Sequence, residues 1–565
     1  MTELLTAAQM RAIEQAAIES GQVTGLELME RAGRGVVDAV FEEWPDLAKA
    51  PHRAVVLCGP GNNGGDGFVV ARRLRDKGWD VEVLFFGDAE KLSPDARKNH
   101  DVWAAMGDIH PLTVAQAGTG PRPALLVDAM FGTGLSRAIP LELANAHHMV
   151  RKRDVGDSHP WLVPFHVVAV DCPSGLDCDS GQFLLPECPE NTGNDAKDFE
   201  IWSRWWRQDA SKRLLRTDLT LAFHRKKIGH VLNDSCGRIR VIDIGLGTED
   251  THPAHLNAPR VADQVIQLDF EAPRGRSARI WPGHDLDKRF GLGRHKYDHG
   301  HALILSGGAG RTGAARLAAR GALRIGAGLV TLGVPPSAQQ EVACQVTALM
   351  LARVDGGEGL AEMLKDQRLN AVCMGPGMGL DRARELVPVA VRAEHAPYVV
   401  LDADALTGFA DAPDVLFGLL HDRCVLTPHG GEFARLFPDI AGKLNAAPTK
   451  GPAYSKVDAT REAAQRAGCV VLFKGPDTVI AAPDGRCSIN SAQYDRAAPW
   501  LATAGSGDVL AGFITGLLAR GFDPMPAAET AAWLHVECAR SFGPGLIAED
   551  LPEELPKVFG ALGLA

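Results

Sequence analysis

The sequence predicts an α/β fold in each of two consecutive domains, and three observations support this. The chain has 565 residues, which is more than one hydrophobic core usually organises, so two domains are the default expectation. Short apolar runs alternate with helical patterns in both halves. The runs are nearly continuous rather than alternating, as expected for strands of a parallel sheet that helices cover on both faces.

These apolar runs give six predicted strands in each half. In the first half they are Ala54–Cys58, Val81–Phe86, Ala124–Asp128, His166–Asp171, Leu219–Phe223 and Ile239–Ile244. In the second half they are Ala302–Ser306, Leu329–Val334, Ala371–Met374, Tyr398–Asp402, Cys424–Thr427 and Cys469–Lys474.

The stretch between the halves, Asp269–Arg294, is rich in Pro, Gly, Arg and Asp and has no periodicity. We therefore predict a first domain over 1–270, a linker over 271–293 and a second domain over 294–565. An acidic and Trp-containing stretch, about 182–216, interrupts the first domain and is interpreted as a surface insertion. A local excursion with a short amphipathic helix is the simpler interpretation, and a lid or partner-binding role is the alternative.

The bulk composition is that of an ordinary globular protein, with 45% hydrophobic and 23% charged residues. The net charge of −11 gives no global basic surface for nucleic acid or anionic lipid, so any anion must be held by local geometry. No apolar stretch is long enough to cross a membrane. We expect small-molecule substrates, with neither nucleic acid nor membrane as a partner.

The eleven cysteines are scattered without a CxxC pair or a metal-ligand spacing. Buried thiols in a reducing compartment explain them best, which favours a cytoplasmic protein. The N-terminus carries no signal peptide, since Thr6–Gln9 looks like a capping box that opens an amphipathic helix.

A dense glycine turn, Gly59–Gly67, directly follows the first predicted strand and precedes the predicted helix Phe68–Lys77. Strand, glycine turn and helix point backbone N–H groups and a positive dipole end at an anion. Two polar turns, beginning at Asp128 and Asp171, follow the third and fourth strands. Because the carboxyl ends of such strands form the ligand crevice, we expect the three turns to converge. The alternative is that Asp128 and Asp171 only cap their own turns.

At these motifs the first half resembles the NAD(P)HX epimerase domain, over most of residues 1–245. The resemblance rests on Leu26–Gly33, the NNGGDG turn, the VDAMFGTGL and VDCPSGLDCDSG segments, Leu219–Phe223 and Lys227–Gly229. It implies a Rossmann-like three-layer fold, and a substrate that is a reduced nicotinamide cofactor hydrated at C6 of its ring.

The same resemblance assigns residues to this site. It implies a K⁺ ion held by Asn63, Asp128 and Ser174. It implies that the damaged dinucleotide contacts Asn62, Asn63, Gly64, Gly65, Asp66, Gly132, Thr133, Gly134, Leu135, Ser136, Arg137, Ala138 and Asp171. By hypothesis Asp171 is the catalytic acid and base, because a carboxylate at a strand end can reach the ring and move a proton.

The second half carries further glycine turns at strand ends, and the most informative is Thr503–Asp508 before the predicted helix Val509–Arg520. A glycine-rich helix N-terminus that closes on an aspartate combines an anion hole with a base, which suits phosphoryl transfer. A structural helix cap is the alternative, but it explains Lys474–Gly475 less well. His429 would by itself be structural more often than functional, and its TPHGGE context favours ligand contact.

From about Arg294 the chain resembles the ADP-dependent NAD(P)HX dehydratase branch of the ribokinase-like fold, a three-layer α/β/α domain. The motifs are HK, GGAGRTGAA, GPGMG, LDADAL, TPHGGE, KGPDT and TAGSGD. The chain departs from the family at two places: Gly430 stands where proline is usual, and Tyr494–Trp500 stands where small residues are usual.

This resemblance implies that the ring hydroxyl is phosphorylated and then eliminated, with ADP or ATP as co-substrate and with Mg²⁺, in a homo-oligomer. Asp508 is the candidate base. Contacts to the hydrated cofactor are implied for Ala315, Gly377, His429 and Asp508. Contacts to the nucleotide are implied for Lys474, Gly475, Pro476, Asp477, Thr478, Thr503, Ala504, Gly505, Ser506 and Gly507.

The two resemblances together imply a bifunctional enzyme that epimerises the R and S hydrates of NADH and NADPH and dehydrates the S form. One alternative is a ribokinase-like small-molecule kinase fused to a dinucleotide-binding domain. A catalytically silent metabolite-binding or scaffold protein is the other alternative, and the joint presence of Asp128, Asp171, Lys474 and Asp508 argues against it.

Overall fold

The computed structural model describes residues 2–153, 165–184, 216–246, 264–268, 286, 288 and 295–564. The chain divides into two compact units. The N-terminal unit comprises Leu4–Asp250 and Ala446–Ser455, and the C-terminal unit comprises Met1–Glu3, Thr251–Asn445 and Lys456–Ala565. Each unit is described by itself below.

The N-terminal unit is built on a seven-stranded sheet in the order β4-β3-β2-β5-β6-β7-β8, and all its recorded strand pairs are parallel. Its strands are β2 (Arg53–Cys58), β3 (Asp80–Phe85), β4 (Ile109–Pro111), β5 (Leu125–Ala129), β6 (His166–Val170), β7 (Leu219–Phe223) and β8 (Arg238–Ile242). The chain order reverses between β2 and β5, so a ligand crevice is expected there.

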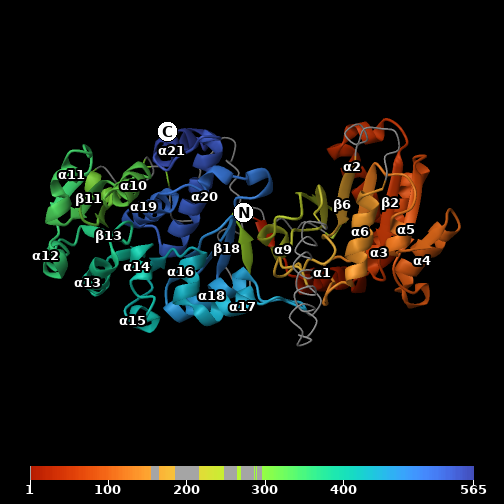
Figure 1. Ribbon diagram of the computed structural model, residues 1–565, viewed down its shortest axis with the longest axis horizontal. Coiled ribbons are helices and arrows are strands. Elements are labelled where there is room, and N and C mark those ends of the chain that lie inside the picture. Colours follow the sequence, from red (N-terminus) through yellow and green to blue (C-terminus); the bar gives the residue numbers. More distant parts are fainter. Residues whose placement is uncertain are drawn as a thin grey trace, which may run out of the picture. The chain divides into compact units, whose positions relative to one another are not determined.

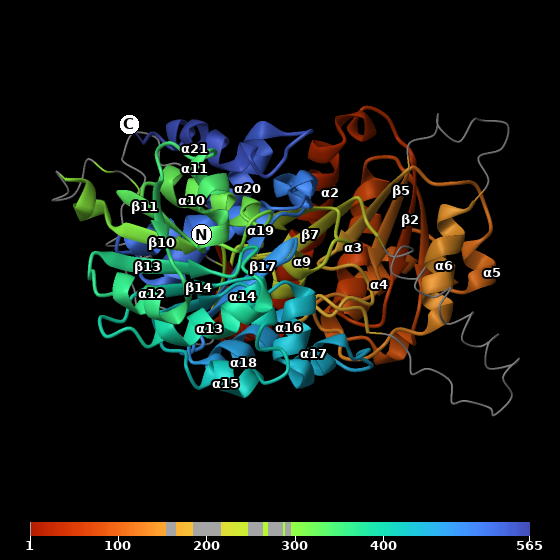
Figure 2. The same cartoon turned by 60° about the vertical axis from the view of Figure 1, so that its left-hand side comes forward.

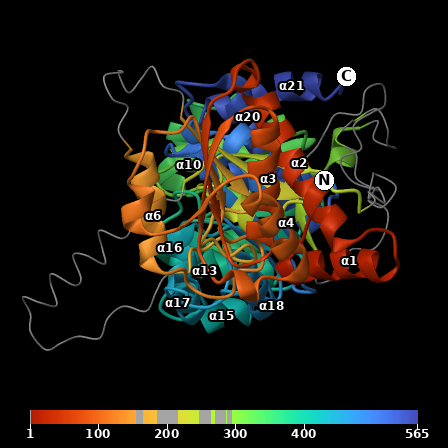
Figure 3. The same ribbon diagram turned by 90° about the vertical axis from the view of Figure 1, so that its right-hand side faces the viewer.

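Helices cover both faces of this sheet, as Figure 3 shows for α2, α3 and α4 on one side and α6 on the other. Alternate residues of β2 separate the two cores, since Val56 packs with the α2 and α3 side and Val55 with the α6 side. The helices are α1 (Ala7–Glu19), α2 (Gly25–Glu43), α3 (Asn62–Asp76), α4 (Pro94–Ala104), α5 (Val114–Ala117), α6 (Leu141–Arg151) and α9 (Ile228–Leu232), with short 3₁₀ turns at Pro45–Ala48 and Ala89–Lys91.

The C-terminal unit has an eleven-stranded sheet in the order β1-β9-β18-β17-β16-β15-β14-β13-β10-β11-β12. The seven strands from β16 to β12 are mutually parallel, whereas β17 runs antiparallel to both of its neighbours. The strands are β1 (Thr2–Leu4), β9 (Val265–Gln267), β10 (His301–Leu305), β11 (Leu329–Val334), β12 (Met350–Arg353), β13 (Leu369–Met374), β14 (Tyr398–Leu401), β15 (Cys424–Leu426), β16 (Val470–Phe473), β17 (Asp477–Ala481) and β18 (Cys487–Ser491).

Two helical layers enclose this sheet (Figures 1 and 2), with α10, α19 and α20 on one face and α13, α16 and α18 on the other. The helices are α10 (Gly313–Arg324), α11 (Gln339–Ala343), α12 (Gly356–Met363), α13 (Leu380–Val391), α14 (Asp404–Thr407), α15 (Pro413–Phe417), α16 (Gly430–Leu436), α17 (Pro438–Asn445), α18 (Lys456–Ala467), α19 (Ser506–Ala519), α20 (Pro524–Phe542) and α21 (Asp550–Ala561). Short 3₁₀ turns accompany them at Lys296–His299, Pro336–Ala338, Tyr494–Arg496 and Pro499–Leu501.

Helices α10 and α19 approach each other closely because their shared face consists of small residues. A Cβ atom added at Gly512 of α19 would lie 2.1 Å from the Ala318 carbonyl oxygen of α10. A Cβ atom at Gly516 would lie 2.4 Å from Ile325 Cγ2. Glycine at both positions therefore allows the short distance between these helices, and this distance affects the position of the α19 N-terminus relative to α10.

Two short segments pack in a different unit from the residues next to them in sequence. Strand β1 adds the first residues of the chain to the sheet of the C-terminal unit. Residues 446–455, which we name the crossover segment, lie between α17 and α18 in sequence but pack in the N-terminal unit. Within the described residues, no helix combines the length and apolar character needed to cross a bilayer.

The α/β class and the parallel sheets expected from the sequence are confirmed. The antiparallel pair β17–β18 and the strands β9 and β1 were not predicted. The boundaries at 270 and 294 stay a prediction, because the proposed linker 271–293 lies outside the described residues except at Leu286 and Lys288. The proposed insertion 182–216 also lies outside them, apart from its first three residues and its last.

Candidate functional site

A cavity of about 800 Å³ in the N-terminal unit opens where the sheet order reverses, with Pro60 after β2, Met130 after β5 and Asp171 after β6 in its wall. The three turns that the sequence predicted to converge do so here. Of the predicted ligand-contacting residues, the cavity is lined by Asn62, Asn63, Asp66, Gly132, Thr133, Gly134, Leu135, Ser136, Arg137, Ala138 and Asp171.

The glycines of the first turn are required by close backbone packing. A Cβ atom at Gly59 would lie 1.7 Å from the Met130 carbonyl oxygen, and one at Gly64 would lie 2.0 Å from the Gly59 carbonyl oxygen. A Cβ atom at Gly65 would lie 2.5 Å from Met29 Sδ. Gly64 and Gly65 are both buried. Their role is to let the N-terminus of α3 pack close to the neighbouring backbone beside the cavity.

Asp171 forms the charged centre of this cavity. Its Oδ1 atom accepts a hydrogen bond of 3.0 Å from the Lys227 ammonium, and its Oδ2 atom accepts one of 2.8 Å from the Thr133 amide. The residue has φ of 64°, a left-handed conformation that costs energy for a non-glycine residue and often marks a functional site. Burial alone would raise the pKa of Asp171, but Lys227, His230 and the Thr133 hydrogen bond outweigh it, so the pKa lies below its ordinary value.

Lys227 and His230 fix the position of Asp171 by hydrogen bonds to its carboxylate and its carbonyl. The Lys227 side chain is fully buried and also donates to the Phe223 carbonyl at 3.0 Å. His230 accepts from the Lys227 amide through Nδ1 at 3.0 Å and reaches the Asp171 carbonyl through Nε2 at 2.9 Å. Burial and the neighbouring Lys227 lower the pKa of His230 to about 4, so the ring is neutral and donates its Nε2 proton to that carbonyl.

His230 also lies in a buried cluster with Cys172 and Cys178, whose potential metal-ligating atoms are within 4.8 Å of one another. Both ring nitrogens of His230 are already engaged by protein groups. Burial raises the pKa of each of the two thiols. Neutral thiols beside an occupied imidazole are a packed support for the Asp171 turn rather than a metal centre.

Asp66 and Glu14 line the same cavity as Asp171, but their pKa values are shifted in the opposite direction. Burial, followed by the charge of Asp171, raises the pKa of both side chains, and for Asp66 the rise is large. The cavity thus contains carboxyl groups whose pKa values are shifted in opposite directions, the arrangement from which acid and base roles are assigned. Sequence reasoning missed Glu14 and assigned no role to Lys227, since neither lies at a strand end with the glycine motifs.

Two of the three predicted K⁺ ligands, Asp128 and Ser174, meet at the carboxyl end of β5. Asp128 is completely buried, and its two oxygens accept from Ser174 Oγ at 2.5 Å and from the Ser174 amide at 2.9 Å. No ion pair to Asp128 occurs among the described residues, and burial raises its pKa. Asn63, the third predicted ligand, lines the cavity, and its Nδ2 atom is buried without a hydrogen-bond partner. A buried carboxyl group whose hydrogen bonds come only from neutral groups suits a hard monovalent ion.

In the C-terminal unit the predicted glycine turns adopt conformations that only glycine takes easily. Gly377 has φ of 62° and Gly505 has φ of 88°. Gly505 precedes α19, so the N–H groups of Gly507 and Asp508 in the first helical turn can face an anion. Of the predicted residues, Ala315 is fully buried in the core beside α10, so its contact with a ligand stays a prediction.

Asp508, Lys474 and Asp402 form an acidic cluster around one cation. The Lys474 ammonium donates to Asp402 Oδ1 at 2.6 Å, and it is 3.9 Å from Glu432 Oε2. Burial and the charge of Asp402 raise the pKa of Asp508 to about 7, although Lys474 opposes the shift. A carboxyl group with this pKa suits a general base at neutral pH. The sequence had identified Lys474 and Asp508, whereas Asp402 and Glu432 were only parts of quoted motifs.

His429 has a structural role that the sequence left open. Its Nδ1 atom accepts from the Gly431 amide at 2.9 Å and from the Glu432 amide at 3.4 Å, so it caps α16. The side chain is 55% exposed, which leaves Nε2 accessible 3.4 Å from Glu432 Oε1. The cap fixes the ring and turns its other edge toward solvent.

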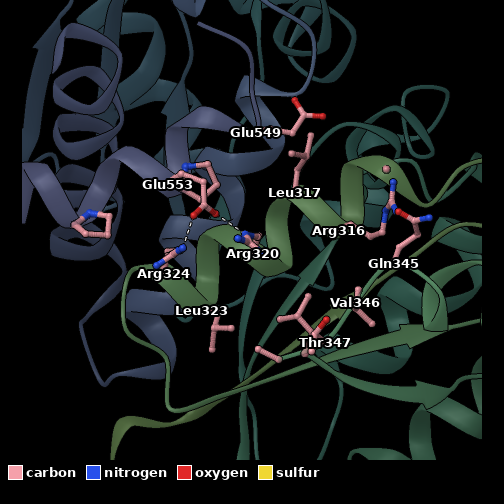
Figure 4. Close-up of a pocket in the computed structure, with 15 residues that line it drawn as sticks. Arg316, Leu317, Arg320, Leu323, Arg324, Gln345, Val346, Thr347, Glu549 and Glu553 are labelled. Carbon is pink, nitrogen blue, oxygen red and sulfur yellow. Dashed lines mark hydrogen bonds and ion pairs between the residues drawn. The ribbon is translucent and has the colours of Figure 1, made fainter. Parts of the chain in front are cut away.

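One hollow borders the glycine turn before α19, and a second lies along α10 and α21. One, of about 340 Å³, is lined by Thr503, the exposed Trp500 and Ile547, and four further residues. The other, of about 780 Å³, runs along α10 and α21 (Figure 4). In the second hollow Glu553 pairs with both Arg320 and Arg324, so its most prominent charges are compensated within the protein.

Two families match separate parts of the chain. The family described as NAD(P)H-hydrate dehydratase matches residues 302–557, and the family described as YjeF-related protein N-terminus matches residues 25–227. A bifunctional NAD(P)H-hydrate repair enzyme of Moorella thermoacetica is 33% identical over 98% of this chain and 96% of its own length. The same name belongs to a Salinibacter ruber protein that is 30% identical over 98% of this chain and 96% of its own length.

Shorter proteins match the halves. An NAD(P)H-hydrate epimerase of Roseobacter litoralis is 39% identical over 44% of this chain and all of its own length. A crystal structure of an ADP/ATP-dependent NAD(P)H-hydrate dehydratase of Bacillus subtilis, co-crystallised with ATP and Mg²⁺, is 28% identical and covers 48% of this chain and 93% of its own, with a TM-score of 0.39.

Proposed function

This chain belongs to the family of bifunctional NAD(P)H-hydrate repair enzymes, and we propose how its residues divide an epimerase and a dehydratase reaction between the two units. The observation that carries the proposal is the contrast between two aspartates. Asp171 is held ionised by Lys227, whereas Asp508 has a pKa of about 7. The first suits a base that is ionised throughout the neutral pH range, and the second suits a base that takes up a proton from the substrate and releases it again near neutral pH.

In the N-terminal unit the substrate is the reduced nicotinamide ring that carries a hydroxyl group at C6. Exchanging the configuration there requires the C6–O bond to break and to form again on the other face. We assign the first proton transfer to Asp66, whose pKa burial raises: the hydroxyl takes this proton and leaves as water, while the lone pair of the ring nitrogen stabilises the positive charge at C6. Water then attacks C6 from the other face and gives a proton to Asp171, which we assign as the base.

The K⁺ ion of this site would be held by Asp128, Ser174 and the amide oxygen of Asn63. When bound, it compensates the buried Asp128 charge and offers a positive field at the ligand. Asp128 and Ser174 position the turn after β5, because the Phe131 amide donates to Ser174 Oγ at 3.0 Å. This turn continues into the residues that line the cavity, beginning with Gly132.

In the C-terminal unit we assign phosphoryl transfer followed by elimination. Asp508 takes the proton of the C6 hydroxyl as the hydroxyl oxygen attacks the terminal phosphorus of ADP or ATP. The bond from this phosphorus to the rest of the nucleotide breaks, and AMP or ADP is the leaving group. The ring then loses phosphate from C6 and a proton from C5, and this restores the C5–C6 double bond. Free N–H groups at the start of α19 stabilise the charge on the moving phosphoryl group.

We assign the nucleotide site by matching the chemical groups of the nucleotide to the residues around the turn before α19. Phosphates fit the turn Thr503–Gly507, and Lys474 provides the nearest cation, since a Cβ atom at Gly507 would lie 3.4 Å from its ammonium. The hollow beside Thr503 offers apolar Trp500 and Ile547 surfaces for the adenine base. Mg²⁺ would be held by nucleotide phosphates and by Asp402 and Glu432, whose oxygens are the donors it prefers.

One experiment tests both assignments. A mixture of the two NADHX epimers is incubated with the full chain, with and without ADP or ATP, and recovery of reduced nicotinamide absorbance is followed. Complete recovery only with nucleotide supports both reactions. Recovery that stops near half of the mixture, faster than spontaneous epimerisation, removes the epimerase assignment. No recovery removes the dehydratase assignment and favours a small-molecule kinase, which a screen for nucleotide consumption with vitamin and sugar alcohols would reveal.

We also propose that the protein is a cytoplasmic homo-oligomer. Its buried free thiols, described for nine of the ten cysteines that the structure covers, support a reducing compartment. Fractionation of cells and light scattering of the purified chain test the two statements.

A further inference from the structure

The crossover segment, residues 446–455, makes regular contacts with a loop of the first cavity. The Ala138 amide donates to the Thr449 carbonyl at 3.2 Å, and the Gly451 amide donates to the Ser136 carbonyl at 3.1 Å. Between these bonds Arg137 and Lys450 form an antiparallel β-bridge. Backbone pairing of this kind fixes the path of both partners, because each bond restrains two backbone groups at once.

The other end of the crossover segment is anchored to the turn after β6. The Ala453 amide donates to Asp177 Oδ2 at 2.8 Å, and the same oxygen accepts from Ser180 Oγ at 2.6 Å. The Gln182 side-chain amide donates to the Tyr454 carbonyl at 2.8 Å. Asp177 is buried, 3% exposed, so the anchor is shielded from water. The segment therefore bridges the turn that follows Asp171 and the loop of Ser136.

The loop that is held in this way is part of the dinucleotide cavity. Leu135, Ser136, Arg137 and Ala138 all line it. In the described structure this loop otherwise depends on one local backbone bond, from the Leu135 amide to the Gly132 carbonyl at 3.1 Å. A loop that contacts ligand gains affinity when it is already ordered in its bound conformation.

We propose that the crossover segment is a positioning element of the epimerase site: by pairing with residues 136–138 it holds the cavity loop in the conformation that binds the hydrated dinucleotide. A stretch that lies inside the dehydratase part of the sequence thus sets the affinity of the epimerase. The segment touches no reacting atom, so its effect falls on binding and leaves the proton transfer at Asp171 unchanged.

A short relative supports a positioning role over a folding role. The Roseobacter litoralis epimerase aligns over its whole length with 44% of this chain, so it has no counterpart of most of the second half. An epimerase fold therefore forms without a crossover segment, and in this chain the segment adds order to a loop. The proposal rests on the assignment of the first cavity to epimerisation, which fails separately if the unmodified chain does not interconvert the epimers.

The test uses the full-length chain with Gly451→Val. A Cβ atom at Gly451 would lie 3.0 Å from Asp177 Oδ1 and 3.4 Å from the Leu135 carbonyl oxygen, so valine pushes the segment away from both anchors. Gly442→Val is the matched control, because a Cβ atom at Gly442 meets nothing within 4 Å. A second variant replaces residues 446–455 by ten alternating Gly and Ser residues.

Epimerisation is measured without nucleotide by chromatographic separation of the two NADHX forms. We expect KM to rise about tenfold or more in Gly451→Val and in the Gly/Ser variant, with kcat within about threefold, and Gly442→Val to match the unmodified chain. Hydrogen exchange of the Ala138 amide should become faster in the first two variants only. An unchanged KM in the Gly/Ser variant overturns the proposal, as does a loss of kcat without a change in KM. Lost protection of the β2 and β5 amides would make the segment a folding requirement and also overturn it.

Discussion

The Lys227 ammonium lies 3.0 Å from Asp171 Oδ1, and this buried ion pair sets the protonation state of the first site. Removing one partner of such a pair leaves the other charge buried without compensation. The pair therefore favours the ionised form of Asp171, while burial raises the pKa of Asp66 in the same cavity.

Lys227→Met keeps the length of the side chain and removes its charge. The pKa of Asp171 should then rise, because burial is no longer opposed by the cation. We expect epimerisation at pH 7 to fall about 10²- to 10⁴-fold, the range of a lost acid–base function, and the acid limb of its pH–rate profile to move to higher pH. Lys98→Met at an exposed position is the control. A variant that keeps both rate and profile would show that Asp171 does not act as the base.

Asp508→Asn separates the two reactions. Dehydration should fall about 10²- to 10⁴-fold while epimerisation stays within about twofold. In the unmodified chain, dehydration at saturating nucleotide should increase with pH through about 7, as Asp508 loses its proton. An increase centred below pH 5 would contradict the base assignment.

The same substitution should change stability in a predictable direction. Asp508 has a folded pKa of about 7 against an ordinary value of 3.8, so the folded chain binds more protons between these values and loses stability as pH rises through them. Asp508→Asn removes this penalty. Thermal unfolding should show a higher Tm than the unmodified chain above pH 7 and little difference near pH 4. A lower Tm at pH 8 would contradict the burial cost.

Removing K⁺ tests the Asp128 cluster. When tetramethylammonium replaces K⁺, we expect epimerisation to slow about tenfold or more, because the larger ion cannot reach the buried carboxylate. Asp128→Asn should make the remaining rate independent of K⁺, since an amide needs no compensating cation. Asp101→Asn at an exposed position should keep the K⁺ response. Equal rates in both salts would exclude an ion at this cluster.

Gly512→Ala tests the close contact of α10 and α19. The new Cβ atom would lie 2.1 Å from the Ala318 carbonyl oxygen, so the helices must separate at a cost of about 1–3 kcal/mol or more. Unfolding of the C-terminal unit, followed by hydrogen exchange in urea, measures the loss. Gly560→Ala is the matched control, because a Cβ atom there meets nothing within 4 Å, and its free energy of unfolding should change by less than about 0.5 kcal/mol.

Local signals explain why so much of the fold could be predicted. Runs such as Val55–Leu57 are apolar on both faces because helices cover both faces of the sheet. Glycine turns mark the strand ends because the backbones there approach to distances that exclude a Cβ atom. These signals are contained in a few consecutive residues, so the three turns around the first cavity could be found.

Contacts between distant residues could not be predicted in the same way. Lys227 reaches Asp171 across 56 positions of sequence, and no pattern near either residue indicates the pair. The antiparallel strand β17 and the crossover segment depend on partners elsewhere in the chain. His429 was identified by its motif, but only the structure showed that one ring nitrogen is used for capping α16.

The crossover segment also has a consequence for how the protein is made. The ribosome releases Asp250 long before Ser455, and the N-terminal unit needs residues from both stretches. At synthesis rates of about 5–20 residues per second, the first cavity waits on the order of 10–40 s for its last backbone partner. The N-terminal unit thus emerges first, but it lacks residues 446–455 until late in synthesis. A translation product that ends before these residues would carry an epimerase unit whose binding loop lacks its backbone partner.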